Sequence, residues 1–241
     1  MRFVWASGSH TGRRRPKNED SIHPEHDGRT SGSLLVAVAD GLGGHRGGEV
    51  ASRLAIKAAA ETAGTPEERA RAANDAILRE VLEQPRLVGM GTTLTLAELR
   101  PGGEVTLAHV GDSRAYWWHA GRFRQVTIDH TFVQAEVDAG RLTTEQARHH
   151  PERSVLTKAL GFGHGLVVDG VRLKVSVGDR LLLCSDGLTS MVRDDRIAEI
   201  LESGAPSDVV WALIEAANRS GGLDNVSVIV VAIAEDEASG D

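Results

Sequence analysis

The chain has 241 residues, of which 41% are hydrophobic and 25% charged, the ordinary composition of a soluble globular protein. Its net charge of −7 argues against nucleic-acid binding, and no segment approaches the roughly 20 apolar residues that a membrane span needs. The single cysteine, Cys184, excludes an internal disulfide and indicates a reducing, cytoplasmic location.

Apolar runs and amphipathic stretches predict the secondary structure. In chain order we expect strands at 2–7 and 34–39, helices at 47–63 and 66–84, strands at 92–99, 104–110, 114–119 and 122–127, a helix at 130–139, strands at 167–175 and 180–185, helices at 194–203 and 207–219 with "PSD" (206–208) as the cap of the last, and a strand at 225–233. Consecutive strands with helices in clusters favour an α+β pair of sheets covered by helices. Without a repeat or a convincing linker, residues 1–241 are expected to form one domain.

Two predicted strands end in the same tripeptide, as "LLVAVADGL" (34–42) and "LLLCSDGL" (181–188). One Asp-Gly pair is most simply a turn signal that stops the strand. A carboxylate at the end of a buried strand is costly unless it is paired or bound to a metal, however. Two such sites, Asp40 and Asp186, therefore suggest a shared cation.

Three further aspartates stand in similar contexts: Asp20 in "NED", Asp112 in "HVGDSRAY" and Asp224 in "GGLDNVSV". Oxygen ligands select Mg²⁺ or Mn²⁺ over zinc or copper. Several carboxylates at one site suit two metals about 3.5–4 Å apart, a common arrangement in phosphoester hydrolysis. A Walker loop, a cysteine-phosphatase loop around Cys184 and zinc-type Cys/His spacing are all missing from the sequence.

The ordered motifs "GRRRPKNED", "VADGLGGHRGGEVAS", "GMGTTLTL", "HVGDSRAYWW", "HPERSVLTKALG", "LLLCSDGLTSMV" and "GGLDNVSVIVV" resemble the bacterial branch of the metal-dependent protein Ser/Thr phosphatases, the type 2C family. The resemblance spans about residues 3–233. It implies a central antiparallel β-sandwich flanked by helices on both sides, in four layers (α-β-β-α), with a binuclear Mn²⁺ or Mg²⁺ site between the sheets. It also implies hydrolysis of phosphoserine and phosphothreonine by a metal-bridging hydroxide.

The resemblance assigns the metal ligands residue by residue. Asp40 would bridge both ions, and the Gly41 carbonyl would bind one of them. Asp186 and Asp224 would hold the other, and Asp20 would join from the first motif. Asp112 would share a third, weaker ion with Asp186; its alternative is an aspartate in a hairpin turn.

Three residues would act on the substrate or on water. Arg15 lies five residues before Asp20, the family spacing of the phosphate-binding arginine, whose fork matches two phosphate oxygens. His45 would protonate the leaving alkoxide, and Glu19 would orient metal-bound water. The alternatives are a loop histidine that only forms hydrogen bonds and a surface glutamate.

The segment of about 129–165 resembles the mobile flap beside the family's catalytic cleft. Ser154 and Lys158 stand where many relatives have Asn and Arg, and His10 stands where relatives often have Asp. These changes touch no predicted ligand, but they leave the substrate preference open.

We interpret the chain as a cytoplasmic protein Ser/Thr phosphatase with two tightly bound Mn²⁺ or Mg²⁺ ions. Its expected partners are phosphorylated proteins, including a Ser/Thr protein kinase, with no nucleic acid and no membrane. The alternatives are a two-metal hydrolase of small phosphoesters and a catalytically inactive module that binds phosphoproteins. The second alternative fits less well, because every matched ligand is present in the sequence.

Overall fold

The computed structural model describes residues 1–42, 47–202 and 204–236. Its strands are β1 (Arg2–His10), β2 (Asp20–His23), β3 (Gly28–Thr30), β4 (Leu34–Leu42), β5 (Gly91–Thr92), β6 (Leu94–Arg100), β7 (Glu104–Val110), β8 (Arg114–His119), β9 (Arg122–Gln125), β10 (Asp169–Lys174), β11 (Arg180–Cys184) and β12 (Val226–Ala234). Its helices are α1 (Gly48–Glu61), α2 (Pro66–Glu83), α3 (Phe132–Asp138), α4 (Thr144–Arg148), α5 (Asp186–Thr189), α6 (Asp194–Leu201), α7 (Pro206–Arg219) and the 3₁₀ turn Pro85–Leu87.

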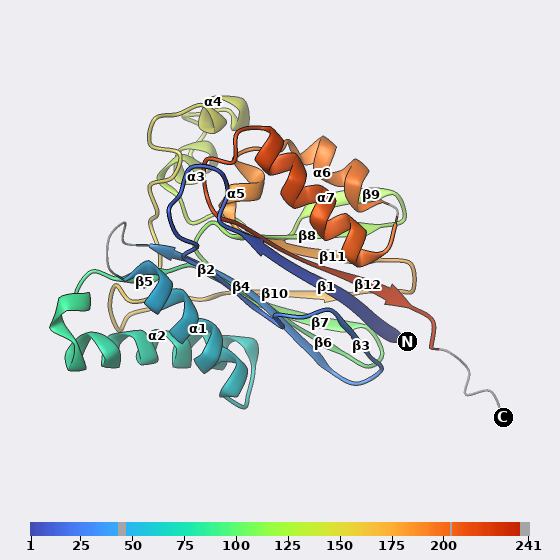
Figure 1. Ribbon diagram of the computed structural model, residues 1–241, viewed down its shortest axis with the longest axis horizontal. Helices are drawn as coiled ribbons and strands as arrows, with labels where there is room; N and C mark the ends of the chain where they lie inside the picture. The colour runs from blue at the N-terminus through green and yellow to red at the C-terminus, as the bar shows by residue number, and fades with distance from the viewer. Residues whose placement is uncertain (43–46, 203, 237–241) are drawn as a thin grey trace.

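The strands form two antiparallel sheets that lie face to face between two layers of helices (Figure 1). One sheet has the order β3-β1-β12-β11-β8-β9, so that the first strand pairs with the last. The other has the order β10-β7-β6-β4-β2, and β5 pairs with β4. This α+β sandwich in four layers confirms the predicted fold class.

The side chains of β4 alternate between the two faces of its sheet. Val36 and Val38 are fully buried among the residues that fill the space between the sheets, whereas Ala37 and Ala39 face α1. Small residues on that face let the helix pack closely on the sheet. Because side chains alternate with a period of two, Asp40 follows Val36 and Val38 onto the face between the sheets. Asp40 therefore lies at the edge of the hydrophobic core between the two sheets.

Each helical layer covers one outer face of the sandwich. α1 and α2 pack on the sheet that contains β4, β6 and β7, and α6 and α7 pack on the sheet that contains β11 and β12. α2 begins with a capping box in which Thr65 and Glu68 satisfy each other's backbone N–H groups. Its buried side includes Ala70, Ala73 and Ile77.

The segment 129–165 contains α3 and α4, which lie together at one end of the sandwich (Figure 1). Its base is tied to the sheets, since the backbone of Leu160 exchanges hydrogen bonds with Thr92 at 2.9 and 3.2 Å. The His130 N–H donates to the Gly111 carbonyl at 2.8 Å, and the Gly111 N–H donates back to the His130 ring at 3.0 Å. The predicted absence of strands in this segment agrees with the structure.

The structure corrects three details of the predicted elements. β4 does not stop before the first Asp-Gly pair, because pairing with β2 and β5 carries it through Asp40 to Leu42. The sequence did not predict β2, β3, α4 and α5, because these elements have too few residues to show a periodic pattern. α7 begins at Pro206 without a side-chain cap, so that Asp208 lies inside its first turn. Within the described residues, no helix combines the length and the apolar composition that crossing a bilayer would need.

Substitutions between the two sheets test whether this core stabilises the fold. Leu183 is fully buried there, whereas Leu82 on α2 is 79% exposed. We expect Leu183→Ala to lower the free energy of unfolding by about 2–5 kcal/mol, because it leaves a cavity between rigid sheets. The control, Leu82→Ala, should change it by less than about 0.5 kcal/mol. Urea denaturation of both variants measures the difference, and equal effects would contradict this account of the core.

Candidate metal centre

Two carboxylates meet across the β2–β4 pair at the mouth of the sandwich. Asp20 and Asp40 are directly opposite each other in the antiparallel register, so both side chains leave the sheet on the same face. That face is the one between the sheets, as the alternation of β4 shows. Two like charges directly opposite each other destabilise a sheet. This register therefore requires a bound cation or protonation of a carboxylate.

The backbone of Asp40 is fixed by two threonines. Its N–H donates to the Thr93 hydroxyl at 2.9 Å, and its carbonyl accepts from the Thr93 N–H at 2.9 Å and from the Thr92 hydroxyl at 2.8 Å. Thr93 is itself held by a hydrogen bond of 2.8 Å to Ser113, beside Asp112. A buried network of this kind fixes the direction of the Asp40 side chain.

The opposite sheet supplies two more carboxylates. Asp186 begins α5, separated from β11 by Ser185 alone, and Asp224 stands two residues before β12. The neighbouring Ser185 hydroxyl donates to Asp20 at 2.8 Å, and so links the two sheets at this point. Asn225 accepts from the Glu19 N–H at 2.8 Å and donates to the carbonyls of Thr11 and Lys17 at 2.9 and 2.8 Å.

Asp112 occupies the connection from β7 in one sheet to β8 in the other. Its side chain is 9% exposed, although it lies in a loop. The preceding Gly111 has φ of 109° and packs so closely on Thr93 that a Cβ atom would lie 2.5 Å from that side chain. Glycine is therefore required for the turn that points Asp112 at the mouth of the sandwich.

These groups line one cavity of about 260 Å³. Its lining residues that the sequence predicted are Arg15, Glu19, Asp40, Gly41, Asp112, Asp186 and Asp224. Asp20 does not line this cavity; it lines a separate space that residues of β1 and α1 also border. Two flap residues, Ser154 and Leu156, complete the wall.

Burial and mutual repulsion raise the pKa values of the aspartates. Burial is the larger cause for Asp20, whose pKa rises to about 7, and for Asp186, whose pKa rises to about 6. The pKa of Asp40 is raised by burial first and then by the charges of Asp20, Asp186, Asp112 and Asp224. Burial, followed by the charge of Asp186, also raises the pKa of Asp112. Each group thus favours a nearby cation or a proton.

Gly41 brings the metal-site backbone against the start of α1. A Cβ atom at Gly41 would lie 2.3 Å from the Gly48 carbonyl oxygen and 2.6 Å from that of Glu19. A Cβ atom at Gly48 would in turn lie 2.8 Å from the Gly41 carbonyl group. Only glycine fits at either position, so β4 and α1 meet backbone to backbone beside the cavity.

Among the described residues, Arg15 is the one basic side chain that lines the cavity. Its Nη2 atom donates to Asp224 Oδ2 at 2.6 Å, and this hydrogen bond is the largest cause of its raised pKa. Of the residues that the structure describes, only Asp224 holds the guanidinium, and this leaves further N–H groups for a ligand. Glu19 is fixed through its backbone: its carbonyl accepts from Gly41 N–H at 3.2 Å and from the Ser52 hydroxyl at 2.6 Å.

His45, the predicted general acid, lies outside the described residues. Sequence reasoning missed Thr93, Ser185 and Asn225, which hold the predicted residues in place. Asn225 directly follows Asp224 in the motif "GGLDNVSV". Its hydrogen-bond partners lie 206 to 214 residues away in the sequence, so no local pattern indicates its role.

The donor set fits a hard divalent cation. The side-chain groups that could bind an ion here are all carboxylates, and Asp20 Oδ1 is buried with no hydrogen-bond partner in the described part of the chain. Yet no three His, Cys, Asp or Glu side chains among the described residues are close enough to enclose an ion by themselves. The carboxylates would thus share bound ions with water and backbone oxygens, as Mg²⁺ and Mn²⁺ commonly require.

Comparisons with known proteins agree with this geometry. The family model described as protein phosphatase 2C matches residues 7–209. The serine/threonine protein phosphatase PstP of Mycobacterium tuberculosis is 42% identical in an alignment of 240 residues that covers 96% of this chain and 45% of PstP. The chain thus spans about half the length of this relative.

Two further comparisons cover whole domains. The serine/threonine phosphatase stp of Listeria monocytogenes is 36% identical over 91% of this chain and 92% of its own length. A crystal structure of the PstP catalytic domain in complex with two manganese ions has a TM-score of 0.86 and 39% identity, and the match covers 98% of this chain and 100% of that one. The chain belongs to the protein phosphatase 2C family.

Proposed function

We propose that the chain hydrolyses phosphoserine and phosphothreonine in proteins at a binuclear Mn²⁺ or Mg²⁺ centre. The observation that carries this proposal is one cavity lined by Asp40, Asp112, Asp186 and Asp224 together with Arg15. The carboxylates attract divalent cations, and the guanidinium offers a fork for phosphate oxygens. The names of the relatives and the two manganese ions in the PstP catalytic domain support the same activity.

In this proposal Asp40 and the Gly41 carbonyl would hold the ions from one sheet, and Asp186 and Asp224 would hold them from the other. Asp20 does not line the cavity, so we assign it an indirect role, through water or through Ser185. When bound, the two ions would lower the pKa of coordinated water and supply the nucleophile.

Arg15 would bind the phosphate while it remains on Asp224. Its Nη2 atom is engaged at 2.6 Å, and the rest of the fork faces the same cavity. The contact therefore positions the phosphate relative to a metal ligand. Glu19 would orient water at the rim, and His45 would protonate the leaving alkoxide.

Several finer expectations belong to the same proposal. Asp112 and Asp186 would share a third, weaker ion, because both line the cavity and the charge of Asp186 raises the pKa of Asp112. The substrates would be phosphorylated proteins, with a Ser/Thr protein kinase among them. Mg²⁺ as the working ion and a cytoplasmic location remain predictions.

The metal requirement is tested on a phosphothreonine peptide and on p-nitrophenyl phosphate. We expect turnover with Mn²⁺ or Mg²⁺ and none with a chelator. Asp40→Asn should lower kcat/KM at least about a hundredfold, equivalent to roughly 3 kcal/mol, because the amide keeps the shape but loses the charge. The control is Asp75→Asn on the exposed side of α2. Turnover in metal-free protein would disprove the mechanism, and faster turnover of the small ester alone would favour a small-molecule hydrolase.

The proposed third ion is tested with Asp112→Ala. We expect the variant to keep two tightly bound Mn²⁺ ions by calorimetric titration and to lose about tenfold or more in kcat, because a carboxylate at the rim no longer shares an ion with Asp186. Asp75→Ala is the matched control. Wild-type kcat across the whole metal titration would leave Asp112 as a turn residue.

The raised pKa values predict how the metal-free protein depends on pH. The pKa of Asp186 is about 6 in the folded state and 3.8 as its ordinary value, so ionisation between these values opposes folding. The difference in unfolding free energy between wild type and Asp186→Asn should therefore fall by roughly 2 kcal/mol as the pH rises from 4 to 7. Denaturant titrations in chelator measure it. A difference that does not change with pH would contradict the electrostatic account.

A further inference from the structure

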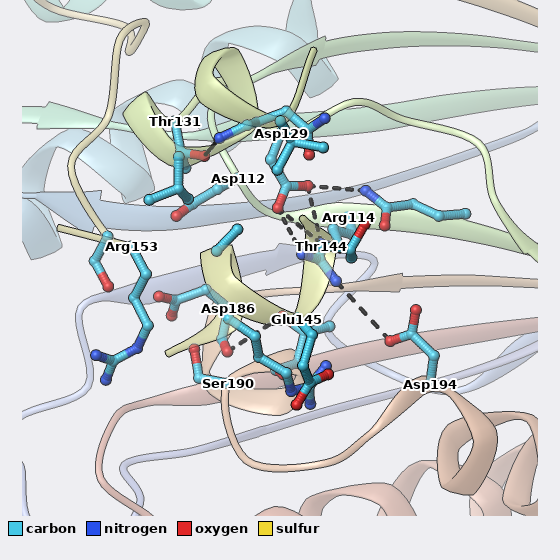
Figure 2. A pocket seen from close by; sticks show the side chains of 18 of the residues that line it. Asp112, Arg114, Asp129, Thr131, Thr144, Glu145, Arg153, Asp186, Ser190 and Asp194 are labelled. Carbon is cyan, nitrogen blue, oxygen red and sulfur yellow. Dashed lines mark hydrogen bonds and ion pairs between the residues drawn. The ribbon is translucent and has the colours of Figure 1, made fainter. Parts of the chain in front are cut away.

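A second cavity of about 400 Å³ lies next to the metal centre, between the flap and the segment that follows Asp186. It shares Asp112, Asp186 and Ser154 with the metal-site cavity, so the two spaces adjoin at these residues. Figure 2 shows the flap residues Thr144, Glu145 and Arg153 gathered around it with Asp186 and Ser190 of the opposite wall. Its volume is sufficient for one or two side chains next to a phosphorylated residue.

The floor of this cavity is rigid. Arg114 on β8 donates to both Asp129 oxygens, with distances from 2.6 to 3.0 Å, and its Nη1 atom donates to the Tyr116 hydroxyl at 2.9 Å. The Tyr116 hydroxyl in turn donates to Asp194 at 3.2 Å, and Arg114 itself forms an ion pair with Asp194 (Figure 2). The paired charges cancel, and the fork of hydrogen bonds fixes the first residue of the flap on the sheet.

The polar attachment of the flap wall, in contrast, comes from a single side chain. Arg148, the last residue of α4, donates from Nη2 to the carbonyls of Thr189 and Val192 at 3.3 Å each. Among the described residues, these are the only hydrogen bonds or ion pairs that join residues 131–156 to the rest of the chain. The other polar contacts of this segment, such as the pair of Arg141 and Glu136, stay within the flap.

The two acceptors are suited to an arginine. Thr189 ends α5, and Val192 lies in the turn before α6, where carbonyls remain without a helical donor. A guanidinium at the end of a helix satisfies such carbonyls. Leu188 and Val192 are buried in the core, so the acceptors belong to the rigid body of the protein and the flap is the part that Arg148 holds.

We propose that Arg148 is a positioning residue for phosphoproteins, because it fixes the flap wall of the cavity in which the polypeptide beside the phosphorylated residue lies. The proposal rests on the phosphatase function proposed above. A phosphopeptide fills both cavities, whereas a small phosphoester fills only the metal-site cavity. Arg148 therefore acts on the KM for peptides and leaves the chemistry at the metal centre unchanged.

The test compares Arg148→Met with Arg141→Met, which removes the same charge from the flap but breaks only a contact inside it. For Arg148→Met we expect the KM for a phosphothreonine peptide to rise about five- to tenfold. The kcat for the peptide and the kcat/KM for p-nitrophenyl phosphate should stay within about twofold. Arg148→Lys should restore part of the loss, since an ammonium reaches one carbonyl but lacks the fork.

Hydrogen exchange gives a readout that does not depend on activity. Amides of residues 143–149 should exchange faster in Arg148→Met than in wild type and Arg141→Met, in the presence of the same Mn²⁺ concentration. This result with no turnover of any phosphoester would overturn the phosphatase function but keep the flap contact. Unchanged exchange, equal KM values in the two methionine variants, or an equal loss on both substrates would overturn the role of Arg148.

Discussion

The repulsion among aspartates at the mouth of the sandwich is the constraint on which the site depends. Asp20 and Asp40 face each other across two strands, while Asp186 comes from the opposite sheet. Burial and like charge oppose the ionised forms of all three groups, so the folded chain stores an affinity for positive charge. The apolar core between the sheets offsets this repulsion, because it holds the strands in register while the carboxylates repel.

The rigidity of the surroundings explains how this arrangement persists. Threonine and serine hydroxyls hold the backbone of Asp40 and the carboxylate of Asp20, and paired glycines bring β4 against α1. The flap is held less firmly. Backbone hydrogen bonds attach its base to the sheets, and the side chain of Arg148 attaches its far end. The fixed part would perform the chemistry, and the loosely held part would meet the variable portion of a phosphoprotein.

The sequence predicts the strands and helices that bury a face, because apolar spacing reports burial directly. β7 and β8 were predicted at their observed bounds for this reason. The short β2 was missed, since its pairing with β4 is decided by tertiary contact rather than by its four residues. The aspartates were found through glycine neighbours and family resemblance, whereas Asn225 and Arg148 act through backbone carbonyls that no motif marks.

The pairing of β1 with β12 decides when the site can form while the protein is being synthesised. A ribosome that has reached only residue 220 has already produced Asp20, Asp40 and Asp186, but it has not produced Asp224 or the strand that separates β1 from β11. The sheet cannot close until that strand inserts in its centre. The nascent polypeptide therefore has no complete cavity until β12 has been translated.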